Sequence, residues 1–175
     1  DAMAMTDGPV AIRWSKTPAP HVGWDEVGRG LAARRLRAGD GQVCLLGAGK
    51  MLAAAQDAAD ELAAEGIDAT VWDPRCIRPL DEEMLADAAR HRLVVTIEDG
   101  FREGGFGTGV LDALAARSHQ NEMPGVSVLG VPVAHHAHGS ADALLASFGL
   151  DGPGVASTVR SRLGTATQEQ KGPQE

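Results

Sequence analysis

Apolar and polar positions alternate with two different periods along most of the chain. Short runs of β-branched and aliphatic residues predict strands buried on both faces, at residues 43–47, 67–73, 93–97 and 126–131. Apolar residues that recur every three or four positions predict helices at 51–64, 81–89, 110–117, 141–148 and 154–162. Strands that alternate with helices are typical of βαβ units. We therefore predict an α/β, three-layer domain with a mostly parallel sheet over residues 42–163.

The ends of several predicted helices carry matching sequence signals. Asp81 and Ser140 stand at N-cap positions, where a side-chain oxygen accepts a backbone N–H. Gly66 and Gly149 follow the last apolar position of two helices and are expected to end them.

The chain before residue 42 has little periodicity. Residues 8–14 predict one strand, which cannot be stable alone and is expected to pair with a segment outside this chain or to dock on the main domain. Residues 15–41 are rich in proline and glycine and predict a linker around a hairpin. The first residue is Asp1 rather than methionine, so we expect a piece of a longer protein. Residues 164–175 are polar and predict a disordered tail.

Composition excludes several classes of partner. A formal net charge of −8 and a pI near 5.2 argue against a surface for nucleic acid or for an anionic membrane. Cys44 and Cys76 lack CxxC spacing and predict reduced thiols in a cytoplasmic protein. No apolar run approaches the roughly 18 residues of a membrane span, and no signal peptide opens the sequence.

Two acids and a run of glycines follow the strand at 93–97. Because ligands gather at the carboxyl ends of strands in open α/β sheets, Glu98 and Asp99 mark the first place to look for a site. Adjacent residues of a strand point to opposite faces, however, so the two carboxylates cannot form a simple acid–base pair. We interpret one of them as the tether of a glycine turn at the sheet edge. Its glycines are Gly100, Gly104, Gly105, Gly107 and Gly109.

A Gly47-Ala48-Gly49 turn after the first buried strand invites comparison with dinucleotide-binding sites. The fingerprint needs a small residue at position 52, where the chain has Leu52. Asp73 also comes later than the usual ribose-binding acid. The sequence therefore favours an ordinary strand-to-helix turn.

Two further groups of residues could carry chemistry. His135, His136 and His138 could in principle hold a metal with Asp142, but we favour a loop in which His138 bonds to backbone. Arg13, at the end of an apolar strand, is placed either to bind a phosphate or carboxylate or to brace the linker as a surface residue.

Four motifs, in order and spacing, resemble one enzyme family. They are GPVAIRW at 8–14, GAGKM to PLD at 47–81, VVTIEDGFREGGFGTGVL at 94–111, and GVP, HGS and FGLD within 130–151. Together they resemble the C-terminal part of the 1-deoxy-D-xylulose-5-phosphate synthase family, thiamine-diphosphate enzymes of the transketolase superfamily. Val133 to His136 and residues 14–17 depart from the family pattern, which suggests a divergent paralogue.

The resemblance implies a division of the chain and a reaction. Residues 1–14 would be the last strand of a preceding pyrimidine-binding domain, 15–41 a linker, 42–163 a transketolase-type C-terminal domain and 164–175 a tail. The family condenses pyruvate with glyceraldehyde 3-phosphate, releases CO2 and supplies isoprenoid precursors. The resemblance assigns Arg13 to the phosphate of glyceraldehyde 3-phosphate.

The resemblance also implies what this segment lacks. Thiamine diphosphate and magnesium would be bound upstream of this chain, which would contribute no catalytic, cofactor-binding or metal-binding residue and would be inactive alone. Its partners would be the missing N-terminal part and a second copy in a homodimer. The alternatives are the β subunit of a 2-oxo acid dehydrogenase, against which the HGS to FGLD ending argues, and a non-catalytic interaction module with the same fold.

Overall fold

The protein is described by a computed structural model of residues 2–12, 21–24, 27–28, 30–117 and 123–169. Arg13 lies outside the described residues. No helix in the described part of the chain is both long and apolar enough to span a bilayer.

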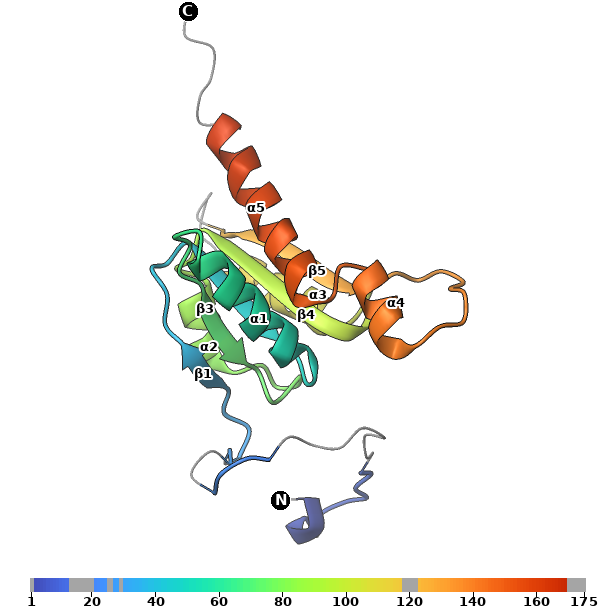
Figure 1. The fold of residues 1–175 in the computed structure, drawn as a ribbon. Helices are drawn as coiled ribbons and strands as arrows, with labels where there is room; N and C mark the ends of the chain where they lie inside the picture. The colour runs from blue at the N-terminus through green and yellow to red at the C-terminus, as the bar shows by residue number, and fades with distance from the viewer. Residues whose placement is uncertain (1, 13–20, 25–26, 29, 118–122, 170–175) are drawn as a thin grey trace, which may run out of the picture.

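One five-stranded sheet organises the molecule (Figure 1). Its spatial order is β1-β3-β2-β4-β5. β3, β2, β4 and β5 run parallel to one another, whereas β1 pairs antiparallel with β3. The strands are β1 (Arg34–Arg37), β2 (Val43–Gly47), β3 (Thr70–Asp73), β4 (Leu93–Phe101) and β5 (Gly125–Val131). The predicted α/β fold with a mostly parallel sheet is confirmed.

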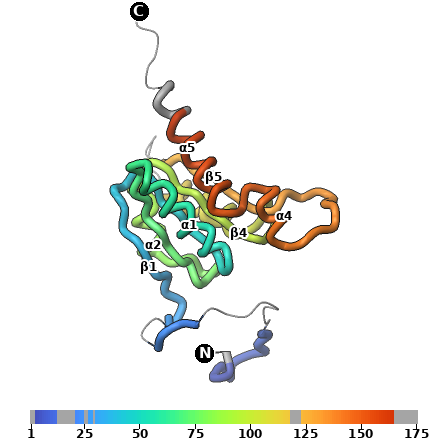
Figure 2. The backbone as a smooth tube through the Cα atoms, in the orientation of Figure 1, coloured from blue at the N-terminus to red at the C-terminus, as the bar shows by residue number. Residues whose placement is uncertain are grey.

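Helices cover both faces of the sheet. α1 (Met51–Ala63) and α5 (Gly152–Glu169) pack on one face, and α2 (Glu82–Ala88) and α3 (Phe106–Arg117) pack on the other. β2 is fully buried between two hydrophobic cores. Leu45 packs into the core beneath α1 and α5, and Leu46 packs into the core beneath α2 and α3. Both faces of the strand therefore need apolar residues, which explains its continuous apolar sequence. Figure 2 shows α4 (Ala141–Ser147) and the loop before it projecting beside the sheet, far from the short helix η1 (Ala2–Ala4).

The predicted helix ends form as expected. The Oδ1 atom of Asp81 accepts a hydrogen bond from Met84 N at 2.8 Å, and Ser140 Oγ accepts one from Ala143 N at 3.3 Å. Gly66 and Gly149 adopt left-handed φ values of 82° and 69° within three residues of the ends of α1 and α4, a conformation that favours glycine.

The predicted linker over 15–41 is wrong at its C-terminal end, because β1 belongs to the sheet. Its sequence, RRLR, is polar, but long-range contacts hold it in place. Arg35 lies over the Trp72 ring at 5.7 Å, and Arg37 pairs with Asp60 and Asp68. Charged side chains are common on edge strands, which explains why the hydrophobic pattern missed this one.

The two ends of the chain have different outcomes. Residues 8–12 are exposed and pair with no strand among the described residues, and the strand expected to pair with a segment outside this chain stays a prediction. The tail predicted from residue 164 is wrong over 164–169, where α5 continues to Glu169. No proline interrupts this stretch, so a helix already fixed by packing can extend through it. Residues 170–175 lie outside the described residues.

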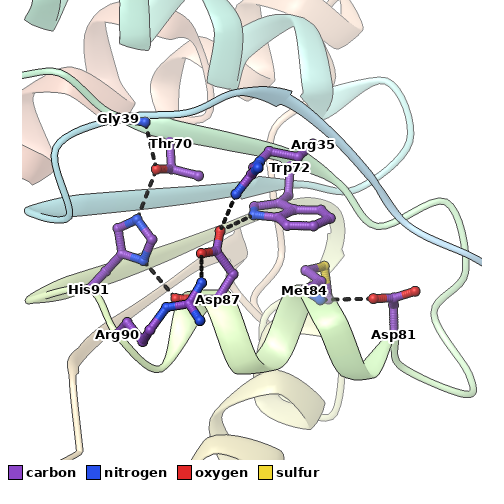
Figure 3. Close-up of polar contacts among 9 residues, drawn as sticks. All are labelled: Arg35, Gly39, Thr70, Trp72, Asp81, Met84, Asp87, Arg90 and His91. Atoms are coloured by element: carbon purple, nitrogen blue, oxygen red, sulfur yellow. Dashed lines mark hydrogen bonds and ion pairs between the residues drawn. The ribbon is translucent and has the colours of Figure 1, made fainter.

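A buried polar network joins the β1 edge to α2 (Figure 3). The Asp87 carboxylate accepts hydrogen bonds from Trp72 Nε1 at 2.8 Å and from Arg90 at 2.6 Å. Thr70 Oγ1 accepts the N–H of Gly39 and lies 2.8 Å from Nε2 of His91. The other ring nitrogen of His91 lies 2.8 Å from the Asp87 carbonyl oxygen, so a histidine protonated on Nδ1 satisfies every group.

We expect this network to make the free energy of unfolding fall as the pH becomes acidic. Burial opposes the charge of Asp87, but hydrogen bonds from Trp72 and Arg90 outweigh it and hold the pKa of Asp87 below its usual value. The resulting stabilisation is present above the unfolded-state pKa of about 4 and is lost as pH falls through the lower folded-state pKa. Asp87→Asn should flatten this loss and cost about 1 kcal/mol near neutral pH.

Urea unfolding of both proteins between about pH 7 and about pH 3 measures this effect. Asp112→Asn removes the same charge from an exposed position of α3 and serves as the control. An unchanged pH dependence in Asp87→Asn would contradict the assignment.

Candidate functional site

A pocket of about 470 Å³ opens at the carboxyl ends of β2 and β4. The connection after β2 leads to β3 on one side, whereas the connection after β4 leads to β5 on the other. The crevice at such a switch point is where open α/β sheets bind ligands. Its lining comes from the loops after β2 and β3, from the end of β4 and the loop after it, and from α3: Ala48, Gly49, Arg75, Ile77, Arg78, Glu98, Asp99, Gly100, Gly104, Gly105, Phe106 and Gly109.

Glu98 caps α3 from inside this pocket. Its side chain is buried, and its two oxygens accept hydrogen bonds from Phe106 N and Gly107 N, each at 2.9 Å. A carboxylate is favourable there because the first N–H groups of a helix lack partners and carry a partial positive charge. The interpretation of one acid as a tether of the glycine turn is confirmed. The cap also starts α3 at Phe106, earlier than the predicted residue 110.

Asp99 has a different environment from its neighbour. Its side chain is half exposed, and its carboxylate lies 3.4 Å from the Lys50 ammonium. Glu98 is buried while Asp99 is exposed, as expected for adjacent strand residues. With both carboxylates engaged separately, the pocket contains no paired acid and base from these two residues.

Arg75 and Arg78 supply positive charge that the sequence analysis did not assign to any site. The Arg75 guanidinium donates to the Ala32 carbonyl at 2.7 Å, and the Arg75 backbone has a φ of 54°. In the sequence, both arginines lie in a loop between Pro74 and Pro79. Only the strand order shows that this loop meets the end of β4.

The Gly47-Ala48-Gly49 turn leads from β2 into α1. A Cβ atom on Gly47 would lie 2.7 Å from the Leu52 Cα atom, so this glycine permits close strand–helix packing. Asp73 accepts the backbone N–H of Arg75 at 3.0 Å. The Gly47 contact fits an ordinary strand-to-helix turn, and the Asp73 carboxylate is engaged in the loop after β3.

The histidine loop lies between β5 and α4. His136, rather than the predicted His138, bonds to backbone: its Nε2 lies 2.8 Å from the Pro132 carbonyl oxygen. The His136 ring also lies 4.6 Å from the Phe148 ring. Among residues with described positions, no group of three His, Cys, Asp or Glu side chains could hold a metal ion.

The two cysteines are free thiols. Cys44 is buried in β2, and burial raises the pKa of its thiol far above the usual value, so it serves packing rather than reactivity. Cys76 is half-buried beside the pocket loop, with Sγ 3.0 Å from the Arg78 carbonyl oxygen.

Comparison with known families identifies the fold. Residues 31–155 match the family model described as "Transketolase, C-terminal domain". The chain belongs to this family. The match begins at residue 31 rather than at the predicted 42, in agreement with the position of β1 in the sheet.

Several curated relatives of this transketolase C-terminal domain are 1-deoxy-D-xylulose-5-phosphate synthases. The chain is 40% identical over 164 residues to a 1-deoxy-D-xylulose-5-phosphate synthase of Anaeromyxobacter dehalogenans, covering 90% of this chain and 26% of that protein. It is 37% identical to the 1-deoxy-D-xylulose-5-phosphate synthase 1 of Kitasatospora griseola, covering 99% and 27%. The chain therefore spans about a quarter of the length of these relatives. The resemblance found in its motifs is confirmed.

Solved structures agree on the architecture. A structure titled "Split gene transketolase, inactive beta4 tetramer" matches with a TM-score of 0.71 and 30% identity, covering 83% of this chain and 47% of that one. A transketolase of Pichia stipitis matches with a TM-score of 0.53 and 18% identity, covering 79% and 19%, and supports the fold alone.

Proposed function

We propose that the chain is the C-terminal segment of a thiamine-diphosphate-dependent synthase, a transferase of the transketolase type. The reaction condenses pyruvate with glyceraldehyde 3-phosphate to 1-deoxy-D-xylulose 5-phosphate with loss of CO2, and supplies isoprenoid biosynthesis. The observation that carries the proposal is the 40% identity to a synthase of that name over 90% of the chain.

The cofactor belongs to the remainder of the enzyme in this proposal. Thiamine diphosphate and magnesium would be bound by residues of the N-terminal part, and the chain alone would be inactive. It would act in the cytoplasm with the N-terminal part of the same enzyme, as a homodimer.

A domain exchange tests the proposal. The matched C-terminal segment of the Anaeromyxobacter dehalogenans synthase is replaced by this chain, and 1-deoxy-D-xylulose 5-phosphate formation is measured. We expect the chimera to be active, and the truncated synthase and the isolated chain to be inactive. A chimera that is folded and dimeric but inactive would contradict the proposal.

Activity of the chimera toward other reactions separates the alternatives. Turnover with a 2-oxo acid and lipoamide, without product from glyceraldehyde 3-phosphate, would favour a dehydrogenase β subunit. A folded chimera without any activity would favour a non-catalytic interaction module.

Arg13 is the residue that we propose contacts substrate. It would hold the phosphate of glyceraldehyde 3-phosphate, because guanidinium groups bind phosphate through paired hydrogen bonds. Arg13→Ala in the active chimera should lower kcat/KM roughly tenfold to a hundredfold. The KM for glyceraldehyde 3-phosphate should rise while the KM for pyruvate changes little. Equal changes in both KM values would contradict a phosphate contact.

A further inference from the structure

The pocket at the carboxyl ends of β2 and β4 has a positively charged side. Arg75 and Arg78 line it, and neither guanidinium pairs with a carboxylate of the described residues. Most other arginines of the sheet domain do form such pairs. They are Arg35, Arg37, Arg90, Arg102, Arg117 and Arg160.

The acids of the pocket do not neutralise these arginines. Glu98 uses both oxygens on N–H groups of α3, and Asp99 pairs with Lys50. Two guanidinium groups therefore remain to meet a negative charge from outside the described residues. An anion that approached them would replace water without displacing a carboxylate of the described residues.

Arg75 is held in position at the pocket wall. One of its terminal nitrogens donates to the Ala32 carbonyl, and its guanidinium packs against Gly28, where an added Cβ would overlap it. One bond to a carbonyl leaves further donors of the planar fork available. Since its position is already restricted, less side-chain entropy is lost when a ligand binds.

The rest of the wall suits a small organic molecule. Gly49 and Gly104 have left-handed φ values and no atom within 4 Å of an added Cβ, so backbone borders open space there. Ile77 and Ala48 add apolar surface. The volume of about 470 Å³ falls within the usual range for ligand sites and exceeds what inorganic phosphate alone would fill.

We propose that this pocket binds a small phosphate monoester, with the phosphate on Arg75 and Arg78 and the carbon part against Ile77. The inference is independent of the proposed synthase activity, because it concerns binding to this chain by itself.

Titration of the 175-residue chain with glycerol 3-phosphate, followed by amide NMR, tests the site. We expect saturable shifts at the pocket glycines, among them Gly49 and Gly104, and weaker binding of inorganic phosphate at the same amides. Arg78→Gln should weaken binding about tenfold or more. Arg92→Gln removes an exposed arginine at the opposite, amino end of β4 and should leave binding unchanged.

Several outcomes would overturn the proposal. One is the absence of saturable shifts in the wild-type chain. Another is a loss of affinity in Arg92→Gln equal to that in Arg78→Gln, which would indicate that the ester is attracted only by positive charge in general. Equal affinity for inorganic phosphate and glycerol 3-phosphate would show that the carbon part of the ester does not contribute to binding, against the proposed contact with Ile77. If Arg78→Gln does not fold, Arg75→Lys, which keeps the charge and removes the planar fork, replaces it and should also weaken binding.

Discussion

Glu98→Ala is expected to lower the free energy of unfolding by about 3–5 kcal/mol. The substitution leaves the N–H groups of Phe106 and Gly107 without an acceptor in a buried environment. Each lost bond to a charged group costs about 1.5–3 kcal/mol, and water cannot fully replace a carboxylate at a packed helix end. The first turn of α3 should therefore fray, together with the glycine wall of the pocket.

Urea unfolding of three variants checks this expectation. Asp99→Ala removes the adjacent, half-exposed acid and its contact with Lys50, and should cost no more than about 0.5 kcal/mol. Glu98→Gln keeps one acceptor oxygen and should fall between the two. A cost for Glu98→Ala as small as that of Asp99→Ala would show that the cap does not stabilise α3.

The alternation of strands and helices could be predicted because the central strands are buried on both faces. Such strands have continuous apolar sequences, as in β2, and helices between them keep one apolar face. β1 could not be predicted in this way. Its contacts with Trp72, Asp60 and Asp68 join residues that are distant in sequence, so no local pattern could show them.

The glycine run after β4 shows the limit of local patterns. Five glycines within residues 100–109 predict a flexible turn, since glycine is a poor helix former. The structure instead starts α3 at Phe106, because Glu98 accepts the N–H groups of the first helical residues. Gly107 is needed because the helix approaches the sheet closely at this residue. Only the tertiary structure shows that Gly107 is required for close contact with the sheet rather than for flexibility.

The candidate site was only partly accessible from the sequence. The position of Glu98 and Asp99 at a strand end followed from the buried strand before them. Arg75 and Arg78 were missed, because their place beside Glu98 depends on the crossing from β3 to β4 over β2. The role of Arg13 remains a proposal, as this residue lies outside the described part of the chain.

Gly107→Ala is expected to destabilise the protein by about 3 kcal/mol, at the upper end of the cost of overpacking. A Cβ on Gly107 would lie 2.5 Å from Val128 Cγ1 and would overlap Thr96 Oγ1. Both neighbours are β-branched residues on paired strands, so they have little rotamer freedom with which to move aside. The helix would have to shift away from the sheet, which would also lengthen the hydrogen bond from Gly107 N to Glu98.

Gly109→Ala supplies the matched control within the same helix. An added Cβ there meets no atom within 4 Å, and alanine is the better helix former, so this change should stabilise the protein by about 0.5–1 kcal/mol. Thermal and urea unfolding of the two variants should therefore shift in opposite directions. If Gly107→Ala were also stabilising, helix propensity would outweigh packing at this position, and α3 would not depend on close approach to β4 and β5.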